Sequence, residues 1–225
     1  MQKIDREASE SLANIIRLRR DIRGNNFTSE PIEQEVLEQI IEAGLHAPSV
    51  GYSQPWKFVI IEDDEVKEKV YTNFEKEYNR SKKHFENRPL YEKLKLEGIK
   101  EAPINMALFY KKSDKKILGQ TSQKKMGEYS VVCAIQNMWL MARSLNVGIG
   151  WVSILKAKKI RKILNVSKKY KLVGYLCVGY VKEFPSKPEL QTLKWNEQKE
   201  YRDVVSWRMK EKNENSSSNH KPTES

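Results

Sequence analysis

A long apolar segment near the middle of the chain constrains the fold most. The segment reads "MGEYSVVCAIQNMWLMARSLNVG" over residues 126–148 and contains no proline. Wound as a helix, it is apolar on nearly every side, and such a helix must be buried in a core or an interface. We therefore expect a helix over residues 126–146 that other elements, or a second subunit, cover.

Four shorter apolar runs predict strands, because each is bounded by turn-forming or charged residues. Further helices are expected over residues 8–20, over the segment that follows Ser29, and over the polar run "KAKKIRKILNV". Ser29 is the expected N-cap of the second of these, with Pro31 in its first turn. The predicted strands are "WKFVIIED", "APINMALFYKK", "GIGWVSIL" and "KLVGYLCVGYV".

The remaining segments read as additions to one domain over residues 1–209. Residues 64–100 are highly charged and helical with few apolar anchors, which favours a lid over a core helix. Residues 182–208 are expected to form an extended C-terminal arm. Residues 210–225, "KEKNENSSSNHKPTES", have the composition of a disordered tail.

Composition narrows the class of protein. The 225 residues are 39% hydrophobic and 32% charged, and no run approaches the ~20 apolar residues that a membrane span needs. The N-terminus carries acids and lacks a signal-peptide pattern, so we expect a cytoplasmic protein without a membrane partner. Cys133 and Cys177 read as buried thiols. No histidine has a partner at metal-ligand spacing, so no metal site is expected.

The net charge of +11 raises the question of nucleic-acid binding. The lysines are scattered and mixed with glutamates, as on an ordinary solvated surface. We expect no nucleic-acid partner, although a basic, non-catalytic nucleic-acid-binding protein remains an alternative. A basic protein can equally gather a small anionic ligand.

One basic cluster stands out near the start of the chain, in "RLRRDIRG" at residues 17–24. Arg19, Arg20 and Arg23 surround a single carboxylate, Asp21. Such residues often do no more than complement the dipole at a helix end. Arginine forks also suit phosphate, and a carboxylate beside them can serve as an acid or base. The cluster alone leaves both interpretations open.

Two other stretches carry polar groups between predicted elements. "HAPSVGYSQPW", residues 46–56, is a turn-rich loop, and "GIGWVSI" places two glycines before a hydroxyl on a strand. Glycines there let a flat ligand approach the backbone. Each stretch can also be purely structural. The phosphate-binding and hydrolase signatures GxxxxGK[ST], GxGxxG and GxSxG do not occur.

Taken in this order, these pieces resemble the flavin-dependent nitroreductase superfamily over roughly residues 15–207. The resemblance rests on the arginine cluster, "APSVGYSQPWKFVII", "YSVVCAIQNMWLMARSLNVGIGWVSI" and "YLCVGYV". Within the superfamily, "RRDIRG", "HAPSVGYSQPW", "ILGQTS", "GWVSI" and "FPSKPEL" are similar to the 5,6-dimethylbenzimidazole synthase branch. An aspartate inside the arginine cluster together with "GWVSI" is the more specific part.

The resemblance implies an α+β, nitroreductase-like fold: an intertwined homodimer with a central, mainly antiparallel sheet flanked by helices. It implies exchanged C-terminal arms and two FMN sites at the interface. Arg19, Arg20 and Arg23 would then hold the FMN phosphate and ribityl end. Pro48, Ser49 and Val50 would contact a flavin of the neighbouring subunit. The isoalloxazine ring would be lined by Gly150, Trp151, Val152 and Ser153. Leu118 and Gln120 would provide further contacts.

The resemblance also implies a reaction in which the flavin is the substrate. Reduced FMN and O2 would yield 5,6-dimethylbenzimidazole and erythrose 4-phosphate, and a separate flavin reductase would supply the reduced FMN. Asp21 would transfer protons, and Ser153 would be a second polar group at the flavin. An NAD(P)H-dependent nitroreductase or quinone reductase that leaves FMN intact is the alternative on the same fold.

The C-terminal arm departs from the family pattern at one point. Family members commonly have an arginine shortly after the tryptophan of "KWNEQKEYRD", and here Gln198 and Lys199 occupy that neighbourhood. A C-terminal contact to the phosphate is therefore left open among Gln198, Lys199 and Arg208.

Overall fold

The computed structural model describes residues 3–208. The described residues up to Glu189 form one compact unit, and those from Leu190 onward form a second, smaller one. Whether the second is an arm of the same domain stays a prediction. The tail expected at 210–225 lies outside the described residues. The longer helices are α1 (Arg6–Leu18), α2 (Gln34–Leu45), α3 (Asp64–Lys82), α4 (Met126–Ser144) and α5 (Ala157–Ile163).

A four-stranded sheet lies at the centre of the larger unit. Its strands are β1 (Trp56–Ile61), β2 (Ile104–Lys111), β3 (Val147–Trp151) and β4 (Tyr170–Tyr180), in the order β1-β2-β4-β3. All three neighbouring pairs are antiparallel. The α+β class and the antiparallel sheet predicted from the sequence are thereby confirmed, and all four predicted strands are present.

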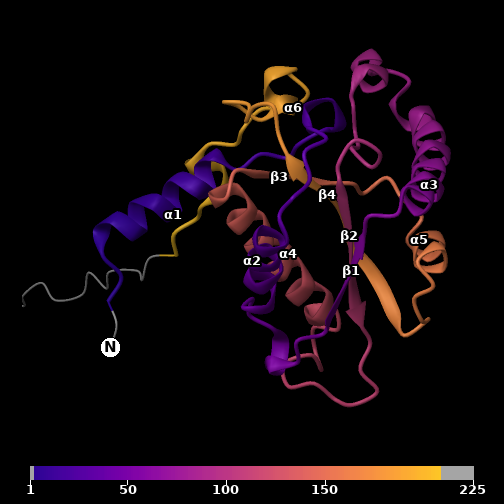
Figure 1. The fold of residues 1–225 in the computed structure, drawn as a ribbon. Coiled ribbons are helices and arrows are strands. Elements are labelled where there is room, and N and C mark those ends of the chain that lie inside the picture. Colours follow the sequence, from indigo (N-terminus) through magenta and orange to yellow (C-terminus); the bar gives the residue numbers. More distant parts are fainter. Residues whose placement is uncertain (1–2, 209–225) are drawn as a thin grey trace, which may run out of the picture. The chain divides into compact units, whose positions relative to one another are not determined.

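Helices cover both faces of this sheet (Figure 1). Along β2, Met106 and Leu108 enter a core cluster that contains buried residues of α2 and α4. The alternating residues Ala107 and Phe109 enter a second cluster with buried residues of α3 and α5. Successive side chains of a strand point to opposite faces of the sheet. Because β2 is buried on both faces, helices must pack against each side of it.

Helix α4 is less completely covered than its composition predicts. Its inward residues, such as Val131, Ile135 and Met138, are fully buried against the sheet. Tyr129 and Val132, however, are 50% and 39% exposed. One subunit therefore leaves an apolar strip of α4 open, and its cover by a second subunit stays a prediction.

Helix α2 begins later than predicted. Ser29 is not its N-cap, because the helix starts at Gln34 and Glu33 occupies the cap position. Phe27 pairs with Val181 just beyond β4, and the Thr28 amide donates to the Tyr180 carbonyl at 2.9 Å. These bonds hold residues 27 and 28 against the end of β4, so tertiary pairing overrides the local capping pattern.

Strand β3 is shorter than predicted and ends at Trp151. The Val152 amide still donates to the Tyr175 carbonyl of β4 at 2.8 Å, but the Leu155 amide then turns back to the Ser153 carbonyl at 2.8 Å. The Lys156 amide donates to the Asn73 side chain on α3. Ser153 therefore lies in the exposed turn that follows the strand.

The charged segment 64–100 begins as a packed helix. Val70 and Phe74 of α3 are buried in the second core cluster. Short 3-10 turns follow at Lys83–Phe85 and Pro89–Lys93, and the rings of Phe74, Tyr78 and Tyr91 stack in sequence. The segment thus has more apolar anchors than its composition predicts, and its role as a lid stays a prediction.

The smaller unit contains little regular structure. Residues 190–208 are not uniformly extended, because α6 (Glu189–Thr192) begins just before them and α7 (Tyr201–Val204) lies within them. Trp207 is 78% exposed, and Gln198, Lys199 and Arg208 are exposed as well.

Two absences hold for residues 3–208. No helix there is long and apolar enough to cross a membrane. No cluster of three or more His, Cys, Asp or Glu side chains arranged to hold a metal ion is present there. Cys177 is buried as expected, whereas Cys133 is only partly buried, and both are free thiols.

Candidate functional site

The chain that leaves α1 runs directly beside β3. Asp21 forms a parallel bridge with Ile149, and the Ile22 amide donates to the Ile149 carbonyl at 3.0 Å. A Cβ atom at Gly150 would lie 2.1 Å from the Ile22 carbonyl oxygen. Gly150 is therefore required for this close backbone approach, which fixes Asp21 at the end of β3.

Asp21 is held by both of its carboxylate oxygens. Oδ1 accepts the Trp151 amide proton at 2.9 Å, and Oδ2 forms an ion pair with Arg23. Burial raises the pKa of the Asp21 carboxyl, against the opposing effects of Arg23, the Trp151 amide and Arg19. Its side chain nevertheless keeps 33% of its surface exposed. A carboxyl with a raised pKa that solvent or a ligand can reach is suited to proton transfer.

The three arginines around Asp21 have different environments. Arg20 is anchored to the backbone, since its guanidinium donates to the carbonyls of Pro185 at 3.0 Å and Arg17 at 2.8 Å, and also to Arg19 and Ser186. Arg23 spans Asp21 and the Leu96 carbonyl, at 3.3 Å from the latter.

Arg19 is the cation with donors to spare. Its guanidinium lies 4.8 Å from the centre of the Trp139 ring, and it has no hydrogen bond or ion pair within the described residues. A half-buried guanidinium with unused donors fits a phosphate oxygen. Of the three predicted phosphate contacts, Arg19 is the one whose donors are unused within the described residues, while Arg20 holds the surrounding backbone.

The structure adds a fourth cation that the sequence did not single out. Arg143, in the last turn of α4, donates from Nε to the Leu18 carbonyl at 3.2 Å, and its guanidinium lies 3.9 Å from the centre of the Phe184 ring. Burial and the nearby charge of Arg20 lower its pKa. An arginine in a last helical turn is a common dipole partner, so its sequence position carried no functional signal.

The three residues that follow Gly150 have different environments. Trp151 is partly buried and its ring tilts against Trp139, with centroids 6.3 Å apart. The side chain of Val152 is buried in the second core cluster, so only its backbone can meet a ligand. Ser153 is exposed and free to offer its hydroxyl.

A second group of predicted residues lies in the loop after α2. The Val50 amide donates to the Ser130 hydroxyl of α4 at 3.1 Å, and the Ser49 hydroxyl accepts the Gln54 amide at 3.1 Å. Gly51, Tyr52 and Gln54 have positive φ. Pro48 is exposed beside them. The loop is thus tightly wound and fixed to the first turn and a half of α4.

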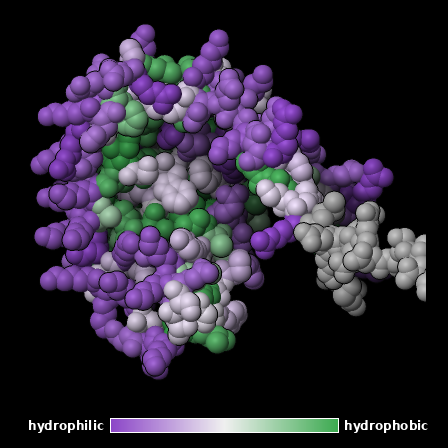
Figure 2. Space-filling model, turned by 180° about the vertical axis from the view of Figure 1, so that it is seen from behind, coloured by the Kyte–Doolittle hydropathy of each residue, from purple (hydrophilic) through white to green (hydrophobic). Residues whose placement is uncertain are grey.

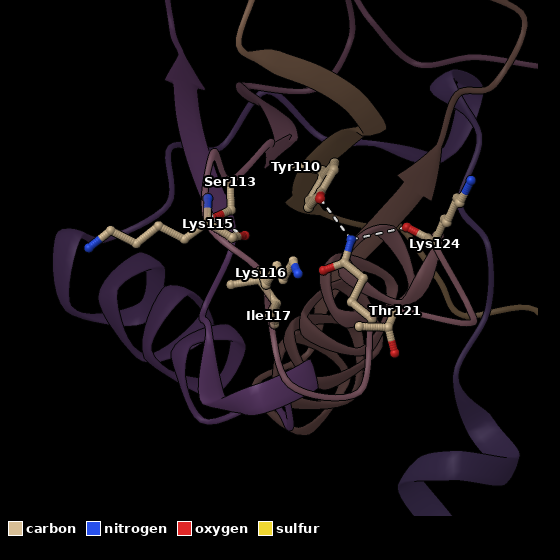
Figure 3. Close-up of a pocket in the computed structure, with 8 residues that line it drawn as sticks. Tyr110, Ser113, Lys115, Lys116, Ile117, Thr121 and Lys124 are labelled. Carbon is tan, nitrogen blue, oxygen red and sulfur yellow. Dashed lines mark hydrogen bonds between the residues drawn. The ribbon is translucent and has the colours of Figure 1, made fainter.

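Leu118 and Gln120 lie against this same loop. A Cβ atom at Gly51 would come within 2.8 Å of the Leu118 carbonyl. Gln120 donates to the Tyr110 hydroxyl and to the Lys124 carbonyl, both at 3.0 Å, and lines a pocket that Figure 3 shows. The Leu118 side chain is 85% exposed.

The predicted flavin contacts therefore form two groups at opposite ends of α4. The arginine cluster is fixed to Trp139 and Arg143, since the Trp139 indole donates to the Arg20 carbonyl at 3.0 Å. The second group is fixed to Ser130. Trp139 follows Ser130 by nine positions along α4, which is about 13.5 Å at the usual rise. Within one subunit the two groups are therefore attached to different parts of α4.

Comparison with known proteins identifies the fold. The model of the nitroreductase family matches residues 16–180. The chain belongs to the nitroreductase family. This confirms the resemblance read from the arginine cluster and the glycine-containing strand.

Relatives within and around the family are similar over most of the chain. Proteins named 5,6-dimethylbenzimidazole synthase are 35% identical in Rhodospirillum rubrum and 30% identical in Rhodobacter capsulatus. The alignments cover 83% and 84% of this chain and 89% and 92% of those proteins. A BluB-like flavoprotein from Clostridium difficile has the same fold, with a TM-score of 0.65 and 21% identity over 88% of this chain and 99% of that one.

Proposed function

We propose that this nitroreductase-family protein is a 5,6-dimethylbenzimidazole synthase. In this reaction O2 would oxidise and fragment reduced FMN into 5,6-dimethylbenzimidazole, the lower ligand of vitamin B12, erythrose 4-phosphate and the remaining pyrimidine part of the flavin ring. Two relatives at 30–35% identity that bear this name support the proposal. The observation that carries it in the structure is Asp21, a carboxyl of raised pKa between the Trp151 amide and Arg23.

The residues around Asp21 fit a flavin phosphate and ring. Arg19 has unused donors for a phosphate oxygen, whereas Arg20 fixes the backbone through the carbonyls of Pro185 and Ser186. Arg23 would keep Asp21 oriented and contribute positive charge near the ribityl chain. The backbone from Gly150 to Val152 and the Ser153 hydroxyl would line the isoalloxazine. FMN is bound in the solved structure of iodotyrosine deiodinase, which has the same fold at a TM-score of 0.66.

Bound reduced FMN would supply both the atoms of the product and the electrons for O2. The chain would contribute orientation, exclusion of water and proton transfer. Asp21 would take up and return a proton, because its raised pKa brings the two protonation states closer in free energy near neutral pH. The Trp151 amide would hold Oδ1 in place during this exchange.

A second copy of the chain would complete the site. The open strip of α4 that contains Tyr129 and Val132, and the half-exposed Leu12 and Ile16 of α1, provide an apolar surface for it. Figure 2 shows hydrophobic residues gathered in a hollow with a hydrophilic rim on one face, as is common at interaction sites. In a homodimer with exchanged arms, Pro48, Ser49 and Val50 of one subunit would reach a flavin held by the arginines of the other.

The segment 64–100 would close the site from its own subunit. Its end is fixed beside the arginine cluster, because the Gly24 amide donates to the Glu97 carbonyl at 2.8 Å and Arg23 donates to the Leu96 carbonyl. A cover over the flavin leaves little room for a nicotinamide, so a separate flavin reductase would supply reduced FMN. A cytoplasmic location fits such a supply.

Product analysis tests the proposal. Photoreduced FMN is mixed with the protein in air, and flavin and benzimidazole are quantified by chromatography with mass detection. We expect loss of FMN and appearance of 5,6-dimethylbenzimidazole, and neither change without O2. Full recovery of FMN, with NAD(P)H-dependent turnover of nitroaromatics or quinones, would instead identify an ordinary reductase.

A further inference from the structure

The segment from the last residue of β2 to the N-cap of α4 is strongly basic. Residues 111–125, here called the lysine loop, hold six lysines, one aspartate and no arginine. All six lysines are exposed. Asp114 pairs with Lys169, outside the loop, and within the described residues none of the six loop lysines has an ion pair. The lysines are Lys111, Lys112, Lys115, Lys116, Lys124 and Lys125.

Two of these lysines lie at the N-terminus of α4. Lys125 is the N-cap of α4 and makes no capping hydrogen bond, and Lys124 precedes it. The positive end of the helix dipole repels cations, so acidic or small polar residues are normally favoured there. Glu128 is the one acidic residue in the first turn of α4, and positions that break such a local rule are candidates for a functional constraint.

The lysine loop also borders residues that the proposed function places at the flavin. Its Leu118 carbonyl lies against Gly51, and the side chain of Val50 would lie 3.3 Å from a Cβ atom at Gly119. Gln120 belongs to the loop itself. A molecule bound to this loop would therefore lie at the edge of the flavin site.

The arrangement of the lysines favours a broad acidic surface as the partner. In Figure 3 the amino groups of Lys115 and Lys124 extend away from the pocket in different directions. A small anion needs several donors converging on one point, and arginine is the preferred residue for phosphate forks. Dispersed lysines instead steer a protein of opposite charge and suit a small, short-lived interface.

We propose that the lysine loop is the docking surface for an acidic protein that delivers reduced FMN. The inference rests on the proposed function, because it takes reduced FMN as the substrate. Docking would shorten the exposure of reduced FMN to O2 in solution. The transfer makes and breaks no covalent bond: reduced FMN leaves the partner and enters the site.

The test compares two sources of reduced FMN for the same enzyme variants. One source is photoreduced free FMN, and the other is an NADH-dependent FMN reductase with an isoelectric point below about 5. The loop variant is Lys115→Gln/Lys116→Gln/Lys124→Gln. The matched control, Lys158→Gln/Lys159→Gln/Lys162→Gln, removes the same charge from exposed positions on and beside α5.

We expect the loop variant to lose about 10-fold in benzimidazole formation with the reductase at low ionic strength. It should equal the parent with photoreduced FMN, and the control should equal the parent with both sources. Titration of the reductase into the parent should show binding at about 20 mM NaCl that is lost at about 300 mM NaCl. The loop variant should show no binding at either salt concentration.

Several results would overturn the docking surface. Equal rates of benzimidazole formation by the parent and the loop variant with the reductase would exclude the docking surface. If the loop variant loses the same fraction of activity with the reductase and with photoreduced FMN, the loop acts in catalysis instead. Binding of a short DNA duplex by the parent but not by the loop variant would indicate a nucleic-acid surface instead. If photoreduced FMN gives no benzimidazole, the proposed function fails, while the binding titration still reports docking.

Discussion

Replacement of Asp21 by asparagine separates its chemical role from its structural one. In the parent the Trp151 amide donates to Asp21 Oδ1 at 2.9 Å. The amide oxygen of Asp21→Asn can still accept this hydrogen bond. The amide can neither accept nor return a proton in the pH range of the reaction. We therefore expect benzimidazole formation to fall by about 100-fold or more, the usual scale of an acid or base contribution.

The cost to stability should be small enough to leave the protein folded. The lost ion pair to Arg23 is partly buried, with side chains 33% and 15% exposed. A hydrogen bond to a charged group contributes about 1.5–3 kcal/mol, and solvent screening reduces this. Removal of the buried negative charge acts in the opposite direction, so the net change in the free energy of unfolding should be about 1 kcal/mol or less. FMN affinity should be retained or slightly raised, because one negative charge beside the phosphate contacts is removed.

The same substitution predicts a change in the pH dependence of stability. Burial raises the pKa of Asp21 above its ordinary value of 3.8. The folded protein therefore binds a proton that the unfolded chain releases, so this group's contribution to stability is present below pH 3.8 and is lost as pH rises through the raised pKa. In urea titrations between pH 3.8 and the raised pKa, the parent should lose this part of its free energy of unfolding as pH rises. Asp21→Asn should show no such loss.

FMN affinity, product yield and subunit mass are measured on one preparation. Flavin fluorescence quenching gives the affinity, and chromatography gives the product. Asp64→Asn is the matched control, since Asp64 is exposed and pairs with Lys67 on α3. A product yield within about 3-fold of the parent would refute proton transfer by Asp21, given the size of such contributions. A parallel collapse of affinity and yield would make it a scaffold residue.

Three further perturbations test the rest of the site. Arg19→Ala should reduce the preference for FMN over riboflavin by about 10-fold, since a charge-assisted bond is lost, and equal effects on both flavins in binding titrations would contradict the assignment. Gly150→Ala should lower the free energy of unfolding by about 1–3 kcal/mol or more in urea, because its Cβ would overlap the Ile22 carbonyl. Val132→Glu should yield monomers with weak FMN binding in sedimentation and titration, and an unchanged dimer would remove α4 from the interface.

The strands could be predicted because their sequences carry the signal locally. In β2 seven of the eight residues are buried, and its uninterrupted apolar run reflects cover on both faces. The start of α2 could not be predicted in the same way. Ser29 has the residue type of an N-cap, but the bond between Thr28 and Tyr180 joins positions far apart in the sequence, and no local pattern records it.

The sequence predicts that the arginines lie together, but it does not predict which arginine binds the backbone and which keeps its donors unused. Sequence alone makes Arg19 and Arg20 equivalent neighbours. Their roles separate because the carbonyls of Pro185 and Ser186 meet one guanidinium while the Trp139 ring lies under the other. Arg143 joins the same cluster from the end of α4. Each of these contacts depends on how distant segments pack.

The predicted flavin contacts form two groups, the arginine cluster and the loop of Ser49 and Val50. This arrangement connects the apolar composition of α4 with the proposed dimer. A helix that is apolar on nearly every side leaves Tyr129 and Val132 open when only one subunit covers it. The same helix holds the arginine cluster near one end and the loop of Ser49 and Val50 near the other. A second subunit that packs on the open strip, related by a two-fold axis, sets the two α4 helices against each other. Such packing would bring one end of α4 toward the opposite end of its partner. One interface would then account both for the apolar residues that α4 leaves exposed in a single subunit and for the division of the predicted contacts into two groups.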